Sequence, residues 1–114
     1  VTGVQTCALP ISTLDFERLD AIRAAVCVPL VLHGGSGTGE SNIREAIRRG
    51  ISKINVATDA FDTAQKGFLQ AAQEDPAADY IALSAASEKA VCSFASDFIR
   101  MVGSVGRISF EELP

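Results

Sequence analysis

The chain has 114 residues, of which 47% are hydrophobic and 21% are charged. This is the composition of one folded domain, because disordered chains are poor in hydrophobic residues and carry a strong excess of one charge. Ten basic and fourteen acidic side chains give a net charge of −4, the opposite of what a sequence-independent nucleic-acid binder needs. No apolar run approaches the roughly 20 residues that span a bilayer, so we expect neither nucleic acid nor a membrane as a partner.

The N-terminal stretch indicates whether the first residues are native, and the cysteines indicate the cellular compartment of the protein. Residues 1–12 (VTGVQTCALPIS) show no clear period and resemble a translated sequencing adapter joined to the reading frame, so we expect a non-native leader there. The alternative for this stretch is a native strand and loop. The three cysteines are widely spaced and form no C-x-x-C pair, which indicates neither a disulfide framework nor a thiolate zinc site. With no signal peptide in view, we expect a cytoplasmic protein with reduced cysteines.

From residue 15 onward the hydrophobic pattern predicts helices and strands in alternation. The first helix carries its apolar residues on one face, and the strands are short, continuously apolar runs of the kind found in parallel sheets covered on both faces. Gly50 stands where a glycine commonly ends a helix. The order of elements indicates an α/β fold with parallel strands. The expected elements are helix 15–26, strand 28–33, helix 40–49, strand 51–56 and helix 58–73.

A last, long helix is expected over residues 79–102, where an apolar stripe includes Ile81, Phe94 and Phe98. The stripe is explained either by packing within the protein or by an arm that contacts a second copy. Two parallel strands do not close a sheet and would leave their edges unpaired, whereas a β/α barrel needs about 250 residues. We therefore expect part of a larger α/β protein.

The first candidate site lies at the end of the first strand, in His33-Gly34-Gly35-Ser36-Gly37. In parallel α/β folds, ligands bind where the carboxyl ends of the strands lead into the following helices. The glycines permit positive φ and a close approach of the backbone, and successive N–H groups with the Ser36 hydroxyl suit a phosphate. A tight turn without a ligand explains the glycines equally well.

The second strand ends in Asn55-Val56-Ala57-Thr58-Asp59. Asn55 and Thr58 are polar groups that suit the same phosphate, since neighbouring parallel strands bring their loops together. Thr58 or Asp59 is also expected to cap the following helix, and for Asp59 we favour this purely structural role.

These two segments, in this order, resemble the C-terminal part of the class II ketose-bisphosphate aldolases, over roughly residues 14–107. The resemblance implies the last two strands of a (β/α)8 TIM barrel, with residues 13–74 as βα units and 75–114 as a C-terminal helical extension. It also implies retro-aldol cleavage of fructose or tagatose 1,6-bisphosphate to dihydroxyacetone phosphate and glyceraldehyde 3-phosphate. The full-length parent is then expected to be a homodimer or homotetramer.

The resemblance assigns roles residue by residue. His33 matches one of three zinc-binding histidines, and Zn²⁺ acts as the Lewis acid that polarises the substrate ketone. The other two histidines and the acid/base aspartate have no counterpart in this chain, whose single histidine cannot hold a catalytic zinc. We therefore expect no catalytic residue in the chain and no turnover by the chain alone. The residues that match the phosphate-binding segments are Gly34, Gly35, Ser36, Asn55, Val56, Ala57 and Thr58.

Other functions remain open on the residues alone. Isomerases and synthases with a barrel fold also bind phosphate in glycine-rich loops late in the chain. A strand lysine that forms a Schiff base would indicate a class I aldolase, but Lys53 matches no catalytic position of the class II family. A small helical interaction module is the alternative outside enzymes.

Overall fold

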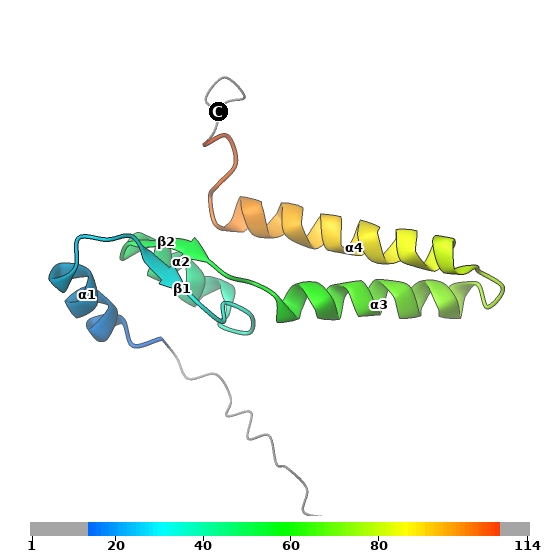
Figure 1. Cartoon of the computed structure of the whole chain (residues 1–114), viewed down its shortest axis with the longest axis horizontal. Coiled ribbons are helices and arrows are strands. Elements are labelled where there is room, and N and C mark those ends of the chain that lie inside the picture. The colour runs from blue at the N-terminus through cyan, green and yellow to red at the C-terminus, as the bar shows by residue number, and fades with distance from the viewer. Residues whose placement is uncertain (1–13, 108–114) are drawn as a thin grey trace, which may run out of the picture.

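A computed structural model describes residues 14–107 of the chain (Figure 1). The expected leader at 1–12 lies outside the described residues, as does the end of the expected extension at 108–114. The architecture is α/β, as the sequence predicts, and its elements follow the predicted order. They are α1 (Phe16–Ala25), β1 (Leu30–Leu32), α2 (Glu40–Arg48), β2 (Ile51–Ile54), α3 (Thr58–Glu74) and α4 (Tyr80–Met101).

The two strands pair in parallel, with Leu30 opposite Ile51 and Leu32 opposite Ile54. Both are shorter than predicted. Pro29 has no N–H to donate to a ladder, and beyond Leu32 the chain turns at Gly34, whose φ is +67°. The pairing still continues past β2, because the Asn55 amide donates to the Leu32 carbonyl at 2.9 Å.

Helix α2 covers one face of this sheet (Figure 1). Its Ile43 and Ala46 are the buried hydrophobic side chains among residues 14–107. The helix ends as predicted: Gly50 has a φ of +106°, and its amide donates to the Ile47 carbonyl at 3.0 Å. The expectation that both faces of the sheet are covered is wrong for residues 14–107, where Val31 remains 42% exposed. The single helix α2 has no counterpart on the opposite face within that range.

Helix α1 docks against the end of α2 through Arg49. The Arg49 guanidinium donates to Glu45 at 2.6 Å, pairs with Asp20 of α1, and lies 5.1 Å from the centre of the Phe16 ring. The hydrogen bond from Arg49 lowers the pKa of the Glu45 carboxyl below its ordinary value. The predicted apolar face of α1 is buried only in part, because Ile22 is 45% exposed. Arg49 therefore connects α1 to the end of α2 through one ion pair and one cation–π contact.

Helices α3 and α4 form an antiparallel hairpin that projects away from the sheet (Figure 1). The two helices approach closely at Gly67, where a Cβ atom would lie 2.7 Å from Cβ of Ala90. The Ser87 hydroxyl donates to the Ala64 carbonyl at 2.9 Å, which fixes the two helices along their axes.

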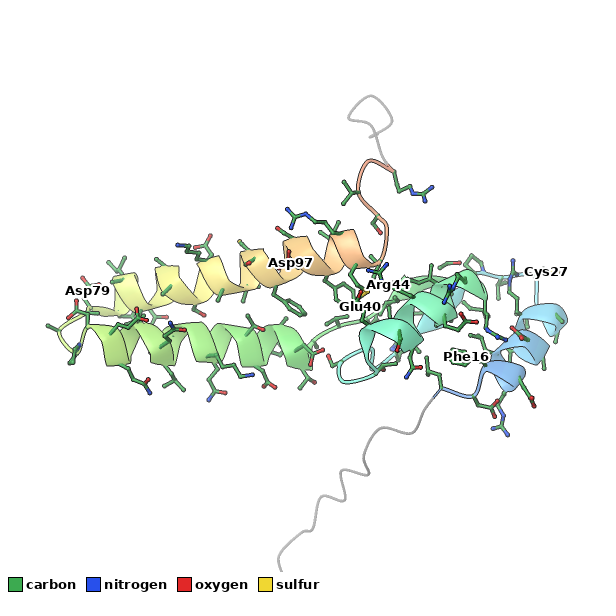
Figure 2. The ribbon with its side chains drawn as sticks, turned by 180° about the vertical axis from the view of Figure 1, so that it is seen from behind. Phe16, Cys27, Glu40, Arg44, Asp79 and Asp97 are labelled. Atoms are coloured by element: carbon green, nitrogen blue, oxygen red, sulfur yellow. The ribbon has the colours of Figure 1, made fainter. Side chains whose placement is uncertain are left out.

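The predicted range of the last helix agrees with α4 within a residue at each end. Asp79 begins it, since its carboxylate accepts from the Ala82 amide at 2.8 Å, and Figure 2 shows this residue at the turn of the hairpin. The predicted apolar stripe holds for Phe94 and Phe98, which are half-buried, but not for Ile81, which is 76% exposed near the tip of the hairpin. No helix within residues 14–107 combines the length and the apolar character needed to cross a membrane.

The contacts of Arg49 predict that α1 is held less firmly when this side chain is removed. In Arg49→Ala, the α1 amides are expected to exchange with deuterium several-fold faster, while the α3–α4 hairpin exchanges as before. Arg44→Ala is the matched control, because Arg44 makes an exposed ion pair with Glu40 on the same helix (Figure 2). Equal exchange of α1 in the two variants would contradict this account.

Candidate functional site

His33 and Asn55 meet where the two parallel strands end. Each follows its strand directly, and Nδ2 of Asn55 lies 3.1 Å from Nδ1 of His33. The His33 side chain is exposed, and that of Asn55 is half-buried. The sequence predicts this juxtaposition, because parallel pairing places the carboxyl ends of neighbouring strands at the same edge of a sheet.

The contact between the two side chains couples the Asn55 amide to the proton on His33. When the amide nitrogen donates to Nδ1, the neutral ring carries its proton on Nε2. When the amide is flipped, Oδ1 accepts from Nδ1–H and the lone pair of Nε2 becomes free. A histidine that binds a metal usually donates its other N–H to such an acceptor. Only the flipped amide therefore leaves Nε2 ready to bind a metal.

The glycines after His33 differ in their roles. Gly34 has the positive φ that the sequence predicts, but Gly35 does not. Gly35 is buried instead, and a Cβ atom there would lie 2.7 Å from Cγ2 of Ile54. Its amide donates to the Asn55 carbonyl at 3.2 Å, so this N–H is already used within the protein. Gly35 thus brings the loop against β2 and does not present its amide to a ligand.

Ser36 joins the two loops of the site. Its hydroxyl oxygen accepts from the Asp59 amide, in the first turn of α3, at 3.2 Å. The prediction that Thr58 or Asp59 caps this helix is wrong. Ala57 occupies the N-cap position and makes no side-chain cap hydrogen bond. The capping oxygen comes from Ser36 in the neighbouring loop, and the hydroxyl proton of Ser36 stays free to donate to an anion.

Unused backbone donors surround this bond. In the described part of the chain, the amides of Ser36, Gly37, Val56, Ala57 and Thr58 donate to no backbone or side-chain acceptor. Those of the second loop lie at the N-terminus of α3, where the helix dipole favours negative charge. Free amides on two adjoining loops are the arrangement that binds phosphate in many proteins.

Thr38 belongs to the site, although the sequence does not predict it. It is 7% exposed, and its hydroxyl donates to the Gly34 carbonyl at 3.2 Å. Its own carbonyl accepts from the Asn42 side chain at 2.9 Å. A threonine between two glycines is the only sequence signal, and it does not reveal that the side chain is buried.

The chain's own donors do not fit a complete zinc site. His33 is the single histidine of the sequence. Across residues 14–107, no three histidine, cysteine or carboxylate side chains come together where a metal ion could be held. Catalytic zinc takes three protein ligands. The described residues supply at most one imidazole, so they do not form a complete catalytic zinc site by themselves.

Fold and site together define an α/β protein whose polar groups gather at the carboxyl ends of two parallel strands. The family model described as "Fructose-bisphosphate aldolase class-II" matches residues 2–107. The chain belongs to the class II fructose-bisphosphate aldolase family, which confirms the resemblance seen in the sequence. A similar solved structure is that of the YdjI aldolase from Escherichia coli K12, with a TM-score of 0.74 and 37% sequence identity. The match covers 85% of this chain but only 36% of that aldolase.

The close approach at Gly35 predicts the cost of adding a methyl group there. Gly35→Ala is expected to lower the free energy of unfolding by about 1–3 kcal/mol through overpacking against Ile54. Replacing glycine also stabilises the protein by about 0.4–1 kcal/mol, because it reduces the conformational entropy of the unfolded chain. We expect the overpacking to outweigh this gain.

A double-mutant cycle measured by urea denaturation separates this clash from other effects. Ile54→Ala removes the Cγ2 methyl that a side chain at position 35 would meet. In that background, Gly35→Ala is expected to cost much less than in the wild type. An equal cost in both backgrounds would show that the contact with Ile54 is not the cause.

Proposed function

We propose that this chain is the C-terminal part of a class II ketose-bisphosphate aldolase barrel. Its full-length parent cleaves fructose or tagatose 1,6-bisphosphate to dihydroxyacetone phosphate and glyceraldehyde 3-phosphate in the cytoplasm. One observation carries the proposal. His33 and Asn55 lie next to each other at the strand ends, beside a loop whose Ser36 hydroxyl accepts from the Asp59 amide in the first turn of α3. Membership of the class II aldolase family supports aldol cleavage as the reaction of the parent protein.

The open sheet supports a barrel context. A cleft of about 440 Å³ is lined by four consecutive residues of β2, Ile51 to Ile54, and by Phe98 and Val102 near the end of α4. Consecutive strand residues point to alternate faces, so a cleft that all four line runs along the edge of the strand. The chain also spans only 36% of the matched aldolase. We therefore place the remaining strands of the barrel along the free edges of β1 and β2.

The α3–α4 hairpin is the proposed helical arm of the parent. It projects from the sheet, and it carries the exposed apolar side chains Phe61, at 72%, and Leu69, at 50%. Exposed apolar groups on a projecting element favour contact with another subunit. This supports a homodimer or homotetramer in the parent.

The residues described here bind and orient the substrate. Free amides at Ser36 and Gly37 and at the start of α3 hold one phosphate group of the sugar, and the Ser36 hydroxyl donates to it. Asn55 orients the His33 ring through the contact between their side chains. Substrate held at this edge of the sheet places its carbon chain beside His33.

His33 is the proposed ligand that this chain contributes to a zinc ion. Bound zinc would polarise the substrate ketone as a Lewis acid. The remaining ligands and the acid/base group belong to the part of the parent outside this chain, so the chain alone is expected to be inactive.

A zinc titration of the isolated chain tests this division. Because the chain supplies one imidazole, calorimetry is expected to show weak binding that His33→Ala weakens further. Cys27 and Cys92 are free and exposed, so the titration is repeated after alkylation to remove binding by thiolates. Tight stoichiometric binding by the alkylated wild-type chain would contradict the assignment of the other ligands to the rest of the parent.

Removal of the Ser36 hydroxyl tests the phosphate site in the full-length parent. Ser36→Ala deletes a donor to a charged acceptor, which is worth about 1.5–3 kcal/mol, or roughly a 10- to 100-fold loss of kcat/KM. Zinc content should stay at the wild-type level, because Ser36 is not a ligand. Ser41→Ala, at an exposed position in the first turn of α2, is the matched control. Unchanged kinetic constants in Ser36→Ala would refute the phosphate assignment.

A further inference from the structure

Thr38 is the buried polar residue among residues 14–107. Its neighbours Gly37 and Gly39 are exposed, so one deeply placed side chain sits within an open glycine loop. It lies outside the predicted phosphate contacts, and the proposed function gives it no task. A buried hydroxyl costs free energy unless it is hydrogen-bonded, and here its bonds all serve the loop.

The bonds of Thr38 close the loop on itself. The hydroxyl donates to the Gly34 carbonyl at 3.2 Å, and the Thr38 amide donates to the Gly35 carbonyl at 3.3 Å. From the other side, the Asn42 side chain of α2 donates to the Thr38 carbonyl at 2.9 Å. The start of the loop, directly after His33, is thereby tied to its end and to a helix.

The loop needs such a tie because its glycines do not fix their own conformation. Gly34, Gly37 and Gly39 have φ values of +67°, +72° and +86°. Glycine reaches these angles easily, but it also loses more conformational freedom than any other residue when it is held there. Without an anchor, a ligand that binds the loop must supply the free energy to order it, and its affinity falls accordingly.

We propose that Thr38 is a positioning residue for the phosphate-binding loop, holding Gly34–Gly37 in the conformation that receives the anion. This rests on the proposed phosphate site. Thr38 does not touch the substrate. It acts through the loop, whose Ser36 must stay close enough to α3 to accept from the Asp59 amide at 3.2 Å.

The test measures binding of inorganic phosphate to the full chain by NMR, well below the melting temperature of each variant. Thr38→Val keeps the shape of the side chain and removes the hydroxyl. It is expected to raise the Kd for phosphate roughly 5- to 10-fold, which is the effect of losing one hydrogen bond that orders the loop. The Asp59 amide resonance should shift as well, because the contact with Ser36 loosens. Thr38→Ser restores the hydroxyl and should restore the wild-type Kd.

Thr63→Val is the matched control. The Thr63 hydroxyl also donates to a carbonyl four residues earlier, that of Asp59, at 2.7 Å, but it lies within α3 and outside the loop. This variant should lose stability without losing phosphate affinity. Asn42→Ala removes the other side-chain bond to the end of the loop and leaves Thr38 intact. It is expected to weaken phosphate binding in the same direction, and it serves as the test if Thr38→Val fails to fold.

The outcomes distinguish the two proposals. If phosphate shifts no amide of either loop in the wild-type chain, both the phosphate site and the role of Thr38 are overturned. If the wild type binds and folded Thr38→Val binds equally well, only the positioning role is overturned. The same holds if Asn42→Ala is the variant that folds and its Kd is unchanged. A loss in Thr38→Val that Thr38→Ser does not restore also contradicts the role of the hydroxyl.

Discussion

The parallel pairing of β1 with β2 is the constraint on which the site depends. Parallel strands present their carboxyl ends at one edge, so the loops after β1 and β2 must leave the sheet side by side. The hydrogen bonds continue past the strands themselves, from the Asn55 amide to Leu32 and from the Gly35 amide to Asn55. This continuation carries the ladder into the loops, and it brings the His33 and Asn55 side chains within 3.1 Å.

Close contact between the first loop and β2 requires a residue without a side chain. Gly35 meets this need, since a Cβ atom there would lie 2.7 Å from Ile54. With the backbone so near, the next residue, Ser36, reaches the Asp59 amide of α3. Gly35 therefore permits the close contact that brings the two loops together. Its importance comes from packing, which differs from the backbone freedom that Gly34 needs.

The sequence predicts those parts of the molecule that depend on local pattern and on the polarity of the strands. The parallel pair and the meeting of His33 with Asn55 follow from strand ends 22 residues apart, joined by one loop, one helix and one strand. The cap of α3 could not be predicted, because its oxygen comes from Ser36, 23 residues before the amide that it accepts from. The burial of Thr38 is likewise a tertiary fact. Threonine and aspartate are common N-cap residues, but in α3 the N-cap residue is Ala57 and the capping oxygen belongs to Ser36 in the neighbouring loop.

The hydrogen bond between Ser36 and Asp59 is compatible with the phosphate site that we propose, because a bound anion would not have to break it. A hydroxyl has one proton to donate and two lone pairs that accept. Toward α3, Ser36 uses a lone pair, so its proton remains for an anion that approaches from the open side of the loop. If Ser36 instead donated its proton to an acceptor in α3, it could not donate to a phosphate without breaking the hydrogen bond that connects the two loops. The direction of this single bond makes the two tasks compatible, and an anion that accepts the Ser36 proton should strengthen the bond to Asp59, because linked hydrogen bonds polarise one another.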